Sequence, residues 1–165
     1  MLRRPGSRAL EVAVYIAAAA TVAGFLIARL VTVAGIAERT VVEATVANLQ
    51  AALHVEYARL VLSARSAETA QWNGANPFRL TGTTAKTYLG EFDRMRPGDH
   101  ESGHWLFDRG AGEVVYLVRW TGGFSTSGPL PNAIRFRLEV GQPPGERPVA
   151  APVFLRPAHP YRWEP

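Results

Sequence analysis

The sequence predicts an α+β fold in which one long N-terminal helix packs against a small antiparallel β-sheet, followed by a loop-rich C-terminal tail. Three patterns predict this class. Residues 12–28 contain no charged side chain, and residues 30–66 contain no proline and place apolar residues at helical spacing. Residues 133–140 alternate between apolar and charged side chains, as a strand with one buried face does. A chain of 165 residues has room for one modest domain and one long helix.

The first half of the predicted helix has the composition of a membrane span. At 1.5 Å per residue, residues 12–28 are near the lower limit for crossing a bilayer core. Arg3, Arg4 and Arg8 precede them, so the positive-inside rule places the N-terminus in the cytoplasm and the rest of the chain outside. We assign residues 7–30 to this transmembrane segment. A cleavable secretory signal is the alternative, but the helical pattern continues past the point where such a signal ends.

The second half of the predicted helix, residues 31–66, is amphipathic. Its apolar side chains recur every three or four residues on one face, at Val42, Val46, Leu49, Leu53, Tyr57 and Leu60. We therefore predict one helix from about Arg8 to Ser66, with this stripe packed on the rest of the protein. A free-standing coiled coil over residues 42–60 is the alternative. Gly24 and Gly35 are points where the helix could loosen or could pack closely against other helices in a membrane.

The remaining part, residues 67–165, is predicted to be a globular head with an antiparallel sheet. Strands are expected at 105–107, 113–120 and 133–140, with a glycine-bearing hairpin between the first two. A three-stranded meander laid over the helix would let each apolar surface cover the other. In the last strand, the side chains expected to face solvent are those of Arg135, Arg137 and Glu139.

Two further elements are expected in the head. A short helix is expected around residues 86–92, within a loop region that continues to about Gly103. Seven of the twelve prolines fall in residues 142–165, so this tail should be extended or loop-like, with 153–155 as an edge strand.

The most specific motif lies in the first eleven residues. A short basic leader ends in Gly6, Ser7 follows it, and Glu11 lies five residues after the glycine at the mouth of the apolar run. A carboxylate at this place is costly in hydrocarbon unless a partner neutralises it. The arrangement resembles the prepilin leader of type IV pilins and type II secretion pseudopilins.

The resemblance implies how the chain is processed and assembled. A prepilin peptidase would remove residues 1–6, Ser7 would become the N-terminus, often methylated, and Glu11 would be the fifth mature residue. Glu11 would then attract the N-terminal amine of a neighbouring subunit, because a buried ion pair avoids the large penalty of either charge alone.

The same resemblance implies a function. The chain would be a structural subunit, a minor pilin or a pseudopilin, of a type IV pilus or type II secretion filament. Its helix would lie in the bacterial inner membrane and its head in the periplasm, with a place in a cell-surface filament after assembly. Its partners would be the prepilin peptidase, other pilin or pseudopilin subunits, the inner-membrane assembly platform and membrane lipid. The alternative is an unprocessed single-pass anchor that carries a periplasmic binding or interaction module.

Composition limits the other classes of function. The net charge of +4 falls to about +2 if Arg3 and Arg4 leave with a leader, so charge does not favour nucleic acid as a partner. The chain contains no cysteine, which excludes disulfides, thiol catalysis and iron–sulfur ligation. The four tryptophans, together with Arg119, Arg135 and Arg162, could form a stacking surface for single-stranded DNA, but aromatic residues on a small sheet more often belong to its core.

One motif of metal chemistry is present. His100-Glu-Ser-Gly-His104 matches the H-E-x-x-H signature of zinc proteases, which requires both histidines on one face of a helix. Pro97-Gly98 before the motif and Gly103 inside it indicate a loop instead. We therefore predict a non-enzymatic protein without a catalytic site, a metal or a cofactor.

Overall fold

The computed structural model describes residues 6–93, 98, 100–141 and 153–164. Its elements follow in the order α1 (Gly6–Leu62), the 3-10 helix η1 (Ser66–Trp72), α2 (Pro77–Thr81), β1 (Tyr88–Phe92), β2 (Trp105–Asp108), β3 (Glu113–Leu117), β4 (Phe124–Thr126), β5 (Ala133–Val140), β6 (Val153–Pro157) and β7 (Tyr161–Trp163). Most of the predicted leader, residues 1–5, and much of the proline-rich tail, residues 142–152, lie outside the described residues.

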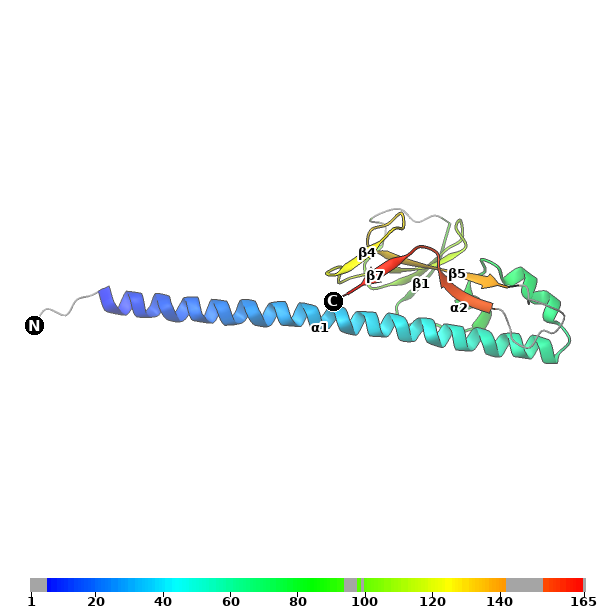
Figure 1. Ribbon diagram of the computed structural model, residues 1–165, viewed down its shortest axis with the longest axis horizontal. Coiled ribbons are helices and arrows are strands. Elements are labelled where there is room, and N and C mark those ends of the chain that lie inside the picture. Colours follow the sequence, from blue (N-terminus) through cyan, green and yellow to red (C-terminus); the bar gives the residue numbers. More distant parts are fainter. Residues whose placement is uncertain (1–5, 94–97, 99, 142–152, 165) are drawn as a thin grey trace, which may run out of the picture.

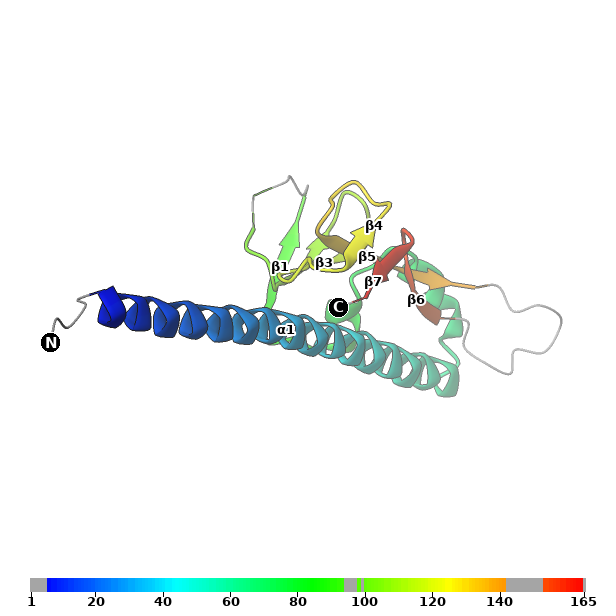
Figure 2. The ribbon, with the colours of Figure 1, turned by 60° about the vertical axis from the view of Figure 1, so that its left-hand side comes forward.

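The arrangement confirms an α+β fold with a long N-terminal helix. Figures 1 and 2 show every strand on one side of α1 and gathered against its C-terminal half, while the N-terminal half projects alone. The helix continues without interruption through Gly24 and Gly35. The chain therefore consists of a rod and a head that share one helix.

The helix ends at Leu62, earlier than the predicted Ser66. The backbone N–H of Arg65 donates to the carbonyl of Leu60 at 2.8 Å, and that of Ala64 donates to the carbonyl of Val61 at 3.1 Å. Ala64 takes the left-handed conformation, with φ of 56°, that this pattern of terminating bonds requires. Glycine is the usual residue at such a position, so alanine gave no sign of the helix end in the sequence.

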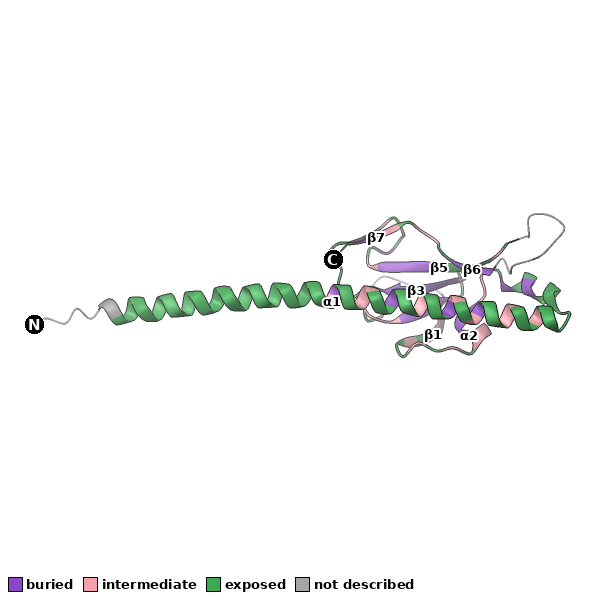
Figure 3. Ribbon diagram, turned by 60° about the horizontal axis from the view of Figure 1, so that its bottom comes forward, coloured by how far each residue is buried: buried purple, intermediate pink, exposed green. Residues whose placement is uncertain are grey.

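The predicted apolar stripe of α1 packs on the head. Val42, Leu49 and Leu53 are buried in the main core, and the other three stripe residues are partly buried against it. Figure 3 shows this change along the helix, from an exposed N-terminal half to a C-terminal half with buried and intermediate positions on one side. Because the head occupies this face, a free-standing coiled coil on residues 42–60 is excluded.

The main sheet has five strands in the order β1-β2-β3-β5-β6. The predicted meander is its centre: β2 pairs antiparallel with β3, and β3 pairs antiparallel with β5. Ile134, Phe136 and Leu138 of β5 enter the core with the helix stripe, as their alternation predicted. The strand predicted at 153–155 is also confirmed, because β6 forms the edge of the sheet beside β5.

The helix predicted around residues 86–92 is wrong, because residues 88–92 form strand β1, parallel to β2. The sheet is therefore mixed rather than purely antiparallel. Packing explains the difference, because the ring of Tyr88 lies against that of Phe78 at a centroid distance of 4.3 Å. A second sheet, β4 with β7, was not predicted.

The short helix of the head is α2, at residues 77–81 instead of 86–92. Its start follows ordinary capping chemistry: the side-chain oxygen of Asn76 accepts from the N–H of Phe78 at 3.0 Å, and Pro77 occupies the first turn. Gly82 ends it in the left-handed conformation, with φ of 64°. Asn76 also ties this helix to β1, because its amide donates to the hydroxyl of Tyr88 at 2.7 Å.

Candidate functional site

The N-terminal half of α1 has no partner within the described chain. Every residue from Arg8 to Val33 is exposed, and the large apolar side chains from Leu10 to Leu30 are each more than half exposed. This part of the helix is long and apolar enough to cross a membrane once, with a mean hydropathy of 2.0 over its most apolar window. A continuous apolar surface of this size on one chain marks a membrane or protein interface.

The predicted processing and assembly residues lie at the start of this helix. Gly6 is its first residue, Ser7 follows in the first turn, and Glu11 is exposed about one turn further along. Among the described residues, Glu11 forms no ion pair, so its carboxylate has no partner there. The structure thus places the three residues at the start of one helix, with no cation of the described residues paired to Glu11.

Glu38 holds the head to the helix at the point where the exposed half ends. Its Oε1 accepts from the hydroxyl of Tyr116 at 2.7 Å and from the backbone N–H of Arg119 at 2.8 Å, and its Oε2 accepts from the backbone N–H of Trp120 at 2.8 Å. Bonds from neutral donors to a carboxylate are among the stronger hydrogen bonds of proteins. Burial, followed by the bond and the charge of Glu38, raises the pKa of Tyr116 well above its usual value.

Two neighbouring contacts complete the junction between helix and head. The guanidinium of Arg39 donates to the carbonyl of Trp163 in β7 at 2.7 Å, which ties the last strand to α1. Gln50 acts on edge strand β6: its amide donates to the carbonyl of Val153 at 2.7 Å and its oxygen accepts from the N–H of Leu155 at 2.7 Å. Gln50 thereby satisfies backbone groups that an edge strand leaves unpaired.

An open groove runs beside Glu38. It has a volume of about 490 Å³ and lies between α1 and the start of β1 and β2, with Val41, Trp105, Tyr116 and Trp120 in its walls. Lys86 and Arg119 also line it. The groove is therefore apolar with a basic margin, and it opens at the end of the head nearest the exposed half of the helix.

The H-E-x-x-H motif lies in the segment before β2 and is not helical. The ring of His100 packs on that of Phe92 at a centroid distance of 4.3 Å. The Nδ1 of His104 instead lies 3.1 Å from the carbonyl oxygen of Glu101 in its own turn. Within the described part of the chain, no group of three or more His, Cys, Asp or Glu residues could hold a metal ion.

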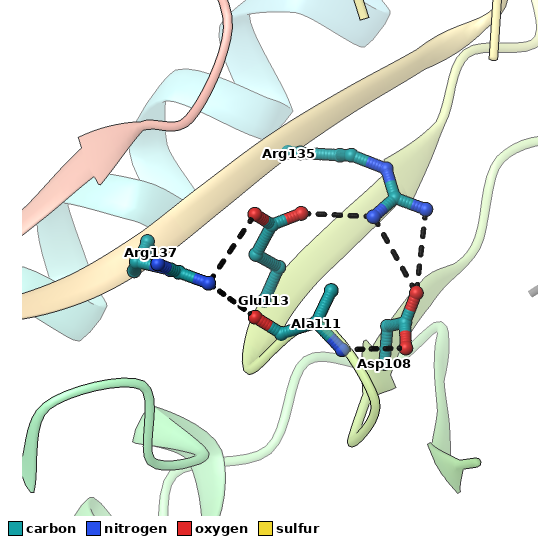
Figure 4. Close-up of polar contacts among 5 residues, drawn as sticks. All are labelled: Asp108, Ala111, Glu113, Arg135 and Arg137. Atoms are coloured by element: carbon teal, nitrogen blue, oxygen red, sulfur yellow. Dashed lines mark hydrogen bonds and ion pairs between the residues drawn. The ribbon is translucent and has the colours of Figure 1, made fainter. Parts of the chain in front are cut away.

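Arg135 was expected to face solvent, and this prediction is wrong. Its side chain is 8% exposed and bridges two buried carboxylates, 2.8 Å from Glu113 and 3.4 Å from Asp108 (Figure 4). Arg137 lies at the edge of this cluster, half exposed and 3.9 Å from Glu113. The outer face of the sheet also carries a second apolar cluster, of Leu106, Val115, Leu117, Leu130 and Ala133. The face opposite α1 is therefore a second core layer, not a solvated surface.

The tryptophans do not form a stacking surface. Trp72, Trp105 and Trp163 are buried in the core with the helix stripe, and only Trp120 is classed as exposed, at 37%. Of the three arginines expected beside them, Arg135 is part of the buried cluster with Asp108 and Glu113.

Glu38 and Gln50 were not identified from the sequence as residues that bind the head, because both lie off the apolar stripe of the helix. A helical-wheel projection of the sequence could have identified them as candidates. At 100° per residue, both lie beside the buried stripe rather than opposite it, where a polar side chain can reach over the edge of a core to the backbone of a neighbouring element.

Comparison of the chain with protein-family models, with curated proteins and with solved structures gave no match. The fold and the exposed helix define the class to which the protein belongs: an α+β protein whose N-terminal helix is able to cross a membrane once. Any narrower assignment depends on the residues of that helix.

Proposed function

We propose that the protein is a pilin-like structural subunit of a type IV pilus or type II secretion filament. A prepilin peptidase cleaves after Gly6, the mature chain begins at Ser7, and the exposed helix packs against the helices of neighbouring subunits. Glu11 neutralises the N-terminal amine of a neighbour during this packing. The protein has no enzymatic role in this proposal.

One observation carries the proposal: a single continuous helix whose N-terminal half is exposed from Arg8 to Val33 and largely apolar, and whose C-terminal half packs in the core of the head. A simple membrane anchor does not require the anchor and the core helix to be one rod. A filament subunit does, because a rigid helix transmits the position of each N-terminus to its head. Glu38 and Arg39 support this role, since they fix the head to the rod where the exposed half ends.

The charge of Glu11, which forms no ion pair among the described residues, supports the same function. A carboxylate at the edge of an apolar segment, covered by lipid or by other helices, is stable only with a positive partner. The free amine created at Ser7 by cleavage is such a partner, and in a staggered row of helices the amine of one chain can lie beside Glu11 of the next. The charge then sets the register of each added subunit.

The proposal includes a place in the cell. The arginines before the span keep the N-terminus in the cytoplasm, so the head lies on the far side of the bacterial inner membrane, in the periplasm. Assembly would move the subunit from the membrane into a filament. The alternative in which residues 1–6 are retained gives the same orientation, with the chain as a permanent membrane anchor.

N-terminal processing tests the proposal. Co-expressed with a prepilin peptidase, the wild-type protein is expected to lose residues 1–6, and intact-mass analysis of the purified membrane protein should show a chain that starts at Ser7. Gly6→Ala should abolish the cleavage. Gly24→Ala is the matched control, because an added Cβ at this helical glycine meets nothing within 4 Å, and it should be processed like wild type. A wild-type chain that retains Met1 under these conditions contradicts the proposal and supports the unprocessed anchor.

A further inference from the structure

The side of α1 that faces away from the head carries a second regular stripe. Its seven members are spaced alternately by three and four residues, and all of them are exposed: Val41, Ala44, Asn48, Ala51, Val55, Ala58 and Leu62. We refer to these seven residues as the outer seam. Val55 and Leu62 are 67% and 89% exposed, so apolar side chains are left uncovered along this helix face. Only at its N-terminal end does the outer seam approach the described part of the head, where Val41 also lines the open groove.

Lipid cannot cover the outer seam. A bilayer core takes about 20 helical residues, and the charge-free span ends at Ala28. At 1.5 Å per residue, the outer seam begins about 20 Å beyond the end of that span and continues for roughly another 30 Å. It therefore lies alongside the head, outside the membrane, and a protein partner has to match its length and shape.

The residue types of the outer seam fit a parallel pair of helices. In heptad terms, the a positions are Val41, Asn48, Val55 and Leu62, and the d positions are all alanine. Two of the four a residues are valine, a β-branched type that parallel dimers place at a. A single asparagine at an a position fixes the register, because it is best satisfied opposite its own copy. Alanine at every d position lets two helix backbones approach closely.

Membrane insertion determines the direction of the pair. The same positive-inside orientation applies to every copy, so two inserted chains meet with their helices parallel. The head does not interfere, because it packs on the stripe from Val42 to Leu60, on the opposite side of α1. The outer seam of a second copy thus has the right length, direction and residue pattern to cover the outer seam of the first.

We propose that the outer seam pairs with the outer seam of a second copy, in a parallel and in-register two-helix contact outside the membrane. Such a contact is isologous, so each seam residue meets the same residue of the partner. Three of the seven residues are alanine, so we expect this contact to bury less than the roughly 1,000 Å² of a stable free-standing interface. Because both copies are confined to one membrane, their effective concentration is high, and a contact of this size can form there.

The proposal rests on the membrane insertion of the proposed function and is independent of leader cleavage. A filament uses heterologous contacts, in which different parts of two neighbours meet. An in-register pair is therefore a state of the membrane-inserted pool, before subunits are added to a filament.

Cross-linking in membranes tests the pair, because the chain has no cysteine of its own. Full-length protein is expressed with one substitution, Ala44→Cys, Ala51→Cys or Ala58→Cys, and isolated membranes are treated with a mild thiol oxidant. Each seam variant is expected to give a disulfide-linked dimer on a non-reducing gel. Glu43→Cys is the matched control: it is adjacent to Ala44 and exposed on the same helix, but at an outer heptad position, and it should remain monomeric.

A charge in the outer seam provides a second readout. Ala51→Glu places two like charges face to face in the pair, and it should reduce the dimer of Ala58→Cys by about tenfold or more. Because Ala51 is exposed, the head should remain folded, which its tryptophan fluorescence verifies. Equal cross-linking at Glu43→Cys, no dimer at any seam position, or a product whose mass shows a different partner would overturn the pair.

The N-terminal mass measured on the same membranes separates the two proposals. Dimer formed by a chain that retains residues 1–6 supports the pair and contradicts processing. A chain that starts at Ser7 and gives no seam dimer supports processing and overturns the pair.

Discussion

Replacement of Arg135 by methionine is expected to destabilise the head by about 3–5 kcal/mol. The guanidinium is the partner of both Asp108 and Glu113, which are no more than a tenth exposed. Without it, two carboxylates remain side by side in a buried position, at adjacent strand ends that face each other in the β2–β3 ladder. Thermal unfolding of the full-length protein in detergent micelles, followed by tryptophan fluorescence, should show a decrease in Tm of more than about 10 °C. All four tryptophans lie outside α1, so this signal reports the head.

Arg137→Met is the matched control for this prediction. Arg137 lies on the same strand and the same face and contacts the same Glu113, but it is half exposed and 3.9 Å away, so its loss should cost less than about 1 kcal/mol. Equal effects of the two substitutions would show that the buried cluster does not hold the sheet together.

Glu38→Ala is expected to cost about 2–3 kcal/mol, because it leaves the buried hydroxyl of Tyr116 and two backbone N–H groups without their acceptor. The effect should be local as well as global. Hydrogen exchange of the amides of Arg119 and Trp120 should accelerate, and the end of β3 should loosen from α1. Fluorescence-detected unfolding in micelles measures the loss of stability, and hydrogen exchange followed by mass spectrometry measures the local loosening.

Glu43→Ala is the control for Glu38. Glu43 is a carboxylate little more than one turn further along the same helix, but the side chains of its pair with Arg39 are 57% and 43% exposed, and such i,i+4 pairs contribute less than about 0.5 kcal/mol. Its removal should leave both readouts near wild type. If Glu38→Ala behaves like Glu43→Ala, the three bonds to Glu38 do not contribute to holding the head on the helix.

The parts of the fold that the sequence predicted are those with a strong period. The stripe from Val42 to Leu60 repeats at helical spacing, and β5 alternates over its whole length, so each pattern identified both the element and its buried face. Because the apolar face of the helix and that of the sheet both have to be buried, their packing against each other could be predicted as well. The first two strands of the meander, β2 and β3, were predicted from the glycine-bearing hairpin signal between them.

The parts that could not be predicted depend on contacts between distant residues. The residues of β1 carry no strand period, and they become a strand because Trp105–Asp108 offers a ladder beside them. Arg135 has the alternation of a solvent-facing residue, and only the positions of Asp108 and Glu113 make it a buried one. Strand alternation identifies two faces, but it does not show whether the second face is covered.

The residues of the candidate site also include some that the sequence could predict and some that it could not. Gly6, Ser7 and Glu11 form a local motif with a fixed spacing, so they could be found in the sequence. Glu38, Arg39 and Gln50 bind parts of the head that are more than 75 residues away along the chain, and no local pattern reports such pairs. The outer seam became visible only after the head was found to cover the opposite face of α1.

Assembly of the processed Glu11→Ala protein tests the central claim most directly. In cells that make and assemble the wild-type chain, both proteins should start at Ser7, because the substitution leaves Gly6 intact. The fraction recovered in sheared, pelleted filaments should be high for wild type and close to zero for Glu11→Ala, since its apolar helix no longer offers a partner for the neighbouring amine. Recovery of Glu11→Ala in filaments at the wild-type level would contradict the assigned role of Glu11, and absence of the wild-type chain from any such filament would contradict the function itself.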